Sequence, residues 1–114
     1  MSRFDFSKEN LSTFPCVQNP GDVVVLKVSG NPLKDFERMQ SFPKMTTLFL
    51  DDTKLCSFKG ARAQPSLRSI SYKRTPLVTS KYTGVMALVV FGRQLETVNG
   101  NKVLIGWQNK ADLL

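Results

Sequence analysis

Apolar residues recur along this chain with a period of 22 residues. Each row follows the pattern apolar-x-x-Leu-x-Leu-x-x-Asn-x-Leu-x-x-Phe, and the clearest row fills it with Val23, Leu26, Val28, Asn31, Leu33 and Phe36. Four rows align, starting near residues 1, 23, 45 and 67, and only the last lacks the closing Phe, which Ser80 replaces. Internal repetition at a period of about 20 to 50 residues is typical of stacked-repeat architectures.

The alternation at the centre of each row predicts one short strand, because successive side chains of a strand point to opposite faces. In the second row, Leu26 and Val28 would point into the core, while their neighbours in the strand point outward. Parallel strands stack about 4.8 Å apart, so the apolar positions of neighbouring rows form columns that no row could bury alone. The sequence therefore predicts an α/β fold in which about four stacked coils share a parallel sheet.

Residues 79–91 predict a helix over the last coil, whose core and strand edge would otherwise be open. Gly92 is placed to end this helix. Three- and four-residue spacing assigns the buried face of the helix to Tyr82, Val85, Met86, Val89 and Val90.

The domain organisation follows from the rows and the helix. We assign residues 1–114 to a single domain, with a cap over 78–105 and a tail over 106–114. No comparable cap precedes Phe4, so we expect the first strand edge to be open to self-association with a second copy.

The four rows resemble the leucine-rich-repeat family, in its short 22-residue intracellular type. That type is found in protein phosphatase regulators and in a spliceosomal protein that clasps an RNA-recognition-motif partner, and similar proteins occur in some protists. The stretch after the last row resembles the family's C-terminal capping motif through Thr75-Pro76-Leu77, Tyr82, Met86-Ala87-Leu88, Leu95-Glu96-Thr97-Val98-Asn99-Gly100 and Val103. Thr75, Thr83 and Asn99 depart from the motif's usual Asn, Arg and Asp. The resemblance implies a right-handed solenoid with a concave parallel sheet and a C-terminal capping helix.

Positive charge gathers in the second half of the chain. Residues 1–54 carry seven Lys or Arg and seven acids, whereas residues 55–114 carry nine Lys or Arg against two acids. The second half therefore accounts for the whole net charge of +7, which favours attraction to an acidic partner at that end.

The first residues show neither a secretory nor a lipidation signal, since no apolar stretch follows Arg3 and Ser2 stands where acylation needs Gly. The longest apolar run is far shorter than the roughly 20 residues that cross a bilayer. We therefore expect an intracellular protein, cytoplasmic or nuclear, without membrane attachment.

Catalysis and metal binding are disfavoured by the residue types present. The chain has no His, so it lacks the usual general base near neutral pH, and no phosphate-binding glycine motif occurs. Cys16 and Cys56 are 40 positions apart without a CxxC motif, which does not suit a zinc site. We expect no enzymatic activity, no cofactor and no small-molecule substrate.

The outward strand positions predict the binding surface, because solenoids of this kind bind partners on the concave face. Phe49 is an aromatic residue among small polar neighbours, as interface anchors are, although single exposed apolar residues are also ordinary. The predicted partner-binding residues are Val25, Lys27, Thr47, Phe49, Asp51, Ser71, Lys73 and Arg74. Four strands span only about 15 Å, which is too narrow for a standard interface of about 800 Å² per partner. The basic loops near Lys73, Arg74 and Lys81 would therefore contribute.

Two functions compete on these residues. The first is a protein-protein interaction module or scaffold that uses the concave face and the basic C-terminal end. The alternative is a component of a ribonucleoprotein or cytoskeletal complex that contacts RNA or an acidic protein surface through the basic end. Single-stranded RNA is usually bound by stacking aromatic residues, and the basic region offers only Tyr72, which the pattern commits to the core, and Tyr82.

Overall fold

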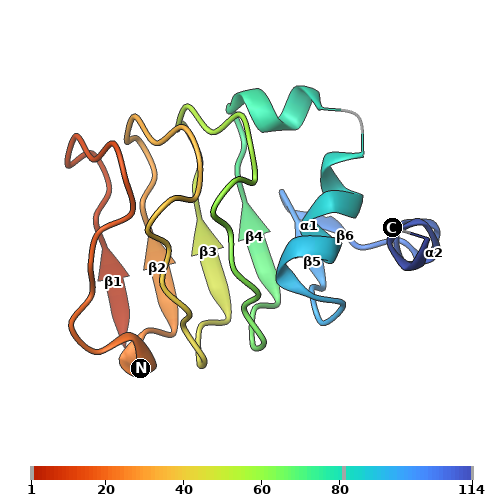
Figure 1. Cartoon of the computed structure of the whole chain (residues 1–114), viewed down its shortest axis with the longest axis horizontal. Helices are drawn as coiled ribbons and strands as arrows, with labels where there is room; N and C mark the ends of the chain where they lie inside the picture. Colours follow the sequence, from red (N-terminus) through yellow and green to blue (C-terminus); the bar gives the residue numbers. More distant parts are fainter. Residues whose placement is uncertain (1, 81, 114) are drawn as a thin grey trace.

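The computed structural model describes residues 2–80 and 82–113, which form one six-stranded sheet and two α-helices. The strands are β1 (Arg3–Asp5), β2 (Val25–Lys27), β3 (Thr47–Phe49), β4 (Ser69–Ser71), β5 (Thr97–Val98) and β6 (Asn101–Lys102). They lie side by side in chain order, parallel from β1 to β5, and β6 closes the sheet as an antiparallel hairpin with β5 (Figure 1). The helices are α1 (Thr83–Phe91) and α2 (Ile105–Asp112), and 3-10 turns occur at Pro20–Asp22 and Pro76–Thr79.

The strand register follows the period of the sequence. Leu26 pairs with Leu48, and Leu48 pairs with Ile70, so neighbouring strands are offset by 22 residues. These three side chains are fully buried, whereas the residues that flank them in each strand are only half-buried. The predicted alternation of inward and outward positions is therefore confirmed for β2, β3 and β4.

The phenylalanine positions of the rows form a stacked column in the core. The rings of Phe14 and Phe36 are stacked with centroids 5.6 Å apart, and those of Phe36 and Phe58 with centroids 5.8 Å apart. Ser80 occupies the equivalent position of the last row. Phe91 from the end of α1 instead contacts both Phe36 and Phe58 edge-on, with centroids 5.6 and 6.1 Å away. The capping helix thereby completes the column.

Side-chain amides connect the rows where the backbone turns. The Asn31 amide oxygen accepts hydrogen bonds from the backbone N–H groups of Glu9 and Leu11 in the preceding row. Its amide nitrogen donates to the carbonyls of Phe6 and Val28. The equivalent Thr53 and Thr75 each donate one hydrogen bond, to a carbonyl of their own row. An amide carries its donors and its acceptor on separate atoms and reaches further than a hydroxyl on Cβ, so Asn31 links two rows while each Thr bonds within its own.

A helix forms within the predicted range 79–91, but its predicted buried face is only partly correct, since Val85 is buried and Val90 is partly buried. Gly92 ends α1 as expected, with φ of 119° and its N–H donating to the Leu88 carbonyl. The helix begins at Thr83, however, and it buries Gly84, Val85, Ala87, Leu88 and Phe91. Tyr82, Met86 and Val89, which the spacing placed in the core, are exposed. The helix is apolar all round, so its spacing alone could not select a face.

Residues 106–114 were assigned to a tail, but the structure forms α2 over Ile105–Asp112 and packs it against α1. Trp107 lies over Gly84, where an added Cβ would come within 2.8 Å of the indole ring. An ion pair between Arg93 and Asp112 also connects α2 to the residues that follow α1. In the described part of the chain, neither helix is long and apolar enough to cross a membrane.

The hairpin between β5 and β6 covers the C-terminal edge of the sheet. Asn99 and Gly100 form its turn with φ of 54° and 81°, a conformation that favours the Asn-Gly pair. The Asn99 side-chain oxygen accepts a hydrogen bond from the Tyr72 N–H just after β4. At the opposite edge, Asp5 in β1 accepts a hydrogen bond from the Ser7 N–H and so occupies a donor at the end of the edge strand.

Candidate binding surface

The outward face of the sheet carries a central aromatic residue. Phe49 at the end of β3 is half-buried and lies between Lys27 of β2 and Ser71 of β4, its register partners. Val25 in β2 and Thr47 in β3 are register partners two residues earlier on the same face, and both are also half-buried. Five of the predicted partner-binding residues therefore lie on one face, with Phe49 in the middle.

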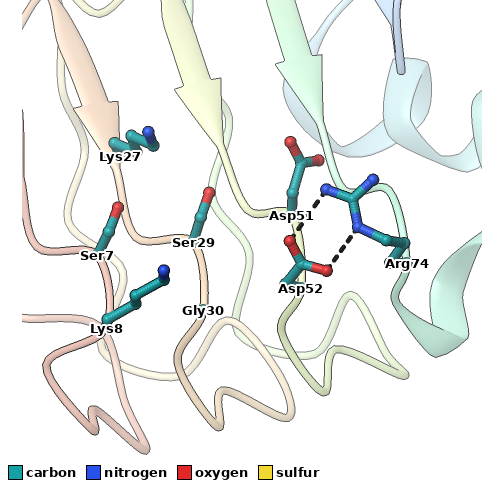
Figure 2. A pocket seen from close by; sticks show the side chains of 8 residues that line it. All are labelled: Ser7, Lys8, Lys27, Ser29, Gly30, Asp51, Asp52 and Arg74. Carbon is teal, nitrogen blue, oxygen red and sulfur yellow. Dashed lines mark hydrogen bonds and ion pairs between the residues drawn. The ribbon is translucent and has the colours of Figure 1, made fainter.

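The strand-end pocket is a cavity of about 310 Å³ where β1 to β4 run into their turns (Figure 2). Its lining residues are Ser7, Lys8, Lys27, Ser29, Gly30, Asp51, Asp52 and Arg74. All but Lys27, which lies in β2, occupy two equivalent positions in successive rows, because the backbone makes the same turn after each strand. Lys8, Gly30, Asp52 and Arg74 each adopt a positive φ there, between 56° and 72°. The pocket thus arises from the repeat itself.

Acidic residues of the pocket are bound by the neighbouring row. Asp51 accepts hydrogen bonds from the Ser71 hydroxyl at 2.6 Å and from the Lys73 N–H at 2.7 Å. Asp52 accepts two from the Arg74 guanidinium, at 2.6 and 2.9 Å, as Figure 2 shows. The hydrogen bond from Arg74 lowers the pKa of Asp52 from its ordinary value, with a smaller attraction from Lys8. Both carboxylates therefore already accept hydrogen bonds from groups of the neighbouring row.

Donor groups predominate on the opposite side of the pocket. The Lys8 side chain crosses Gly30, where an added Cβ would lie 2.9 Å from its Cγ. The hydroxyls of Ser7 and Ser29 are buried without a partner in hydrogen-bond geometry. The Ser7 side chain still faces Asp5 closely enough to help lower the pKa of that carboxyl, so Ser29 is the clearer unpaired hydroxyl. This side of the pocket offers unpaired donors to a ligand.

The structure unites some predicted site residues and adds others. Lys27, Asp51 and Arg74 line the strand-end pocket, whereas Lys73 contributes its backbone N–H to Asp51. Sequence reasoning missed Lys8 and Asp52, although the 22-residue spacing that aligns them with Arg74 was already visible. Lys81, expected to contribute a basic loop, lies outside the described residues.

Four of the nine Lys and Arg residues in the second half of the chain form ion pairs with acids within the described residues. Ion pairs join Lys59 to Glu37, Arg68 to Glu96, Arg74 to Asp52 and Arg93 to Asp112. All are exposed, so each contributes little to stability. Their effect on recognition is larger, because four cations of this half already face a carboxylate.

The described residues contain no group of three or more His, Cys, Asp or Glu side chains that could hold a metal ion. Phe49 beside a pocket of charged and hydroxyl groups suits recognition of another molecule.

No protein-family model matches the sequence, and no curated protein matches it either. Among solved structures, the chain is similar to one in the crystal structure of the Drosophila melanogaster SNF/U2A' complex. The two chains share 16% sequence identity with a TM-score of 0.47, over 79% of this chain and 67% of the other. A proposal about function has to rest on this chain's own residues.

Proposed function

We propose that this chain is a single leucine-rich-repeat domain, a solenoid of about four coils, that acts as a non-catalytic protein-binding module. The register of 22 residues between neighbouring strands supports the solenoid, as does the column of Phe14, Phe36 and Phe58. An intracellular location, cytoplasmic or nuclear, is part of this proposal.

The position of Phe49 is the observation that carries the binding proposal. Its ring stands between the side chains of two neighbouring strands, with Val25 on the diagonal, and the strand-end pocket begins beside it at Lys27. An aromatic anchor with polar groups around it matches the centre of a protein interface, where few residues supply most of the affinity. The partner would place an apolar side chain over Phe49 and polar groups toward the pocket.

Affinity purification with the wild-type chain, Phe49→Ala and Lys73→Glu/Arg74→Glu tests this proposal. We expect Phe49→Ala to lose at least one protein that the wild type retains, and Val78→Ala, an exposed change outside the sheet, to retain it. If Phe49→Ala and Lys73→Glu/Arg74→Glu both retain every partner of the wild type, the concave face is not the binding surface.

The alternative, a component of a ribonucleoprotein or cytoskeletal complex, rests on the positive charge of the second half. Its support is limited, because Tyr72 is buried and one face of the Tyr82 ring is occupied by the Lys110 ammonium, 4.7 Å from the ring centroid. Binding to bulk RNA that weakens steeply with added salt would favour the alternative, and no binding at low salt would remove its RNA form.

A further inference from the structure

Exposed apolar side chains are confined to the capping end of this protein. Among the described residues, every large hydrophobic side chain that is exposed falls between 78 and 113: Val78, Tyr82, Met86, Val89, Leu104, Ile105 and Leu113. The sheet and turns before residue 78 have none. Contiguous apolar exposure of this kind marks interaction sites in folded proteins, whereas isolated exposed residues are ordinary.

Helix α1 and the residue before it supply three of these side chains. Met86 and Val89 are three residues apart in α1 and lie on one side of the helix, and Tyr82 immediately precedes the helix; their exposed fractions are 37, 41 and 50%. Helix α1 contains no charged residue at all. A helix that is apolar all round is usually buried on every side, and α1 is buried only where it meets the core and α2.

A pocket adjoins this stripe between the two helices. It has a volume of about 260 Å³ and is lined by Ser80, Tyr82, Thr83, Gly84, Val85, Trp107 and Lys110. The Trp107 ring packs directly against Gly84, and Tyr82 belongs both to the pocket and to the stripe. A concave, mostly aromatic and aliphatic recess with a polar rim accepts an inserted side chain. A flat lipid surface could not fill such a recess.

The charges at this end define the occupant further. Both acids in the described residues from 78 onward are held by arginines, Glu96 by Arg68 and Asp112 by Arg93. Lys110 stands on the pocket rim, and no ion pair involves Lys102. A second copy of the chain would bring lysines against lysines, whereas an acidic partner would be attracted.

We propose that the stripe of Tyr82, Met86 and Val89, together with the pocket beside it, is a second docking site that binds an amphipathic helix of another protein with acidic residues flanking its apolar face. The site is separate from the outward face of the sheet. The protein would then join two partners, one at each surface, as a small scaffold does.

Titration of the isotope-labelled protein with designed peptides tests the proposal. The probes are a helical peptide with Leu at i, i+3, i+4 and i+7 and Glu elsewhere, the same peptide with Lys in place of Glu, and phosphatidylserine vesicles. We expect the Glu peptide to bind and to shift amide signals of 83–91 and 105–112. The Lys peptide should bind at least about tenfold more weakly.

Variants separate this site from the sheet surface. Met86→Ser/Val89→Ser should weaken the Glu peptide by about tenfold or more, while unchanged melting shows that the fold persists. Lys110→Glu should reduce the ratio of the affinity for the Glu peptide to the affinity for the Lys peptide. Phe49→Ala should leave the peptide affinity unchanged, so the two proposals fail independently.

Several outcomes overturn the proposal. Equal binding of both peptides removes the acidic partner, and unchanged binding by Met86→Ser/Val89→Ser removes the stripe. Binding to vesicles without binding to the Glu peptide assigns the surface to lipid. A dimer that dissociates in Met86→Ser/Val89→Ser assigns it to a second copy.

Discussion

The Phe91 ring at the end of α1 packs edge-on against the Phe36 ring, which lies 55 positions earlier in the chain, with centroids 5.6 Å apart and planes at 66°. The contact joins the repeat to its cap. Ser80 stands where the last row would have placed a phenylalanine, and Phe91 fills the core from another direction. The stability of the cap and that of the rows are therefore coupled through one aromatic cluster.

Phe91→Ala should destabilise the whole protein, because it removes a fully buried ring and leaves a cavity beside the stacked rings of Phe36 and Phe58. Truncation of a buried Phe to Ala costs about 3 to 5 kcal/mol in the free energy of unfolding. Urea denaturation followed by circular dichroism measures this loss. Met86→Ala on the exposed side of the same helix should change the value by less than about 1 kcal/mol, and equal losses would contradict the assigned helix face.

Gly84→Ala should displace α2 from α1, because the new Cβ would meet the Trp107 ring at 2.8 Å. Trp107 is the only tryptophan, so its fluorescence reports on the contact directly. We expect a red-shifted emission and a lower melting temperature. Gly106→Ala is the matched control, since nothing lies within 4 Å of its added Cβ. Its effect should be neutral or stabilising by about 0.4 to 1 kcal/mol, and an unshifted spectrum in Gly84→Ala would refute the packing.

Asn31→Thr should destabilise the first row, although the substitution removes few atoms. The substitution removes the acceptor for the N–H groups of Glu9 and Leu11, and unmet backbone donors in a part-buried setting cost about 1 to 3 kcal/mol. Hydrogen exchange should become faster at those two amides. Thr53→Val removes one hydrogen bond within its own row and should cost less. Unchanged exchange at Glu9 would argue against the bridging role of Asn31.

Acidification should lower stability through Asp52. Its pKa is lowered in the folded state by the hydrogen bond from Arg74, so its contribution is present above the unfolded value of 3.8 and is lost as pH falls below it. Melting temperatures measured at about pH 6 and about pH 3 should differ less in Asp52→Asn than in the wild type. Asp22→Asn serves as a charge control, and added salt should reduce the effect. An identical pH dependence in Asp52→Asn would contradict it.

The sequence by itself determined the four strands of the repeat, β1 to β4, with their register and the faces they bury, whereas β5 and β6 were not predicted. Leu26, Leu48 and Ile70 recur at a fixed spacing, and a strand side chain has only two directions to choose between. A period of 22 residues therefore sets both which residues pair and which point inward. The turn after each strand also repeats, so the alignment of Lys8, Asp52 and Arg74 was present in the sequence as well.

Only the tertiary structure decided how helices α1 and α2 pack at the C-terminal end of the protein. Helix α1 is apolar on every side, so periodicity could not distinguish the buried Leu88 from the exposed Met86. The contact of Phe91 with the phenylalanine column and the fit of Trp107 over Gly84 made that choice. These contacts join segments that do not belong to the repeat, and their geometry depends on shape complementarity that no local pattern encodes.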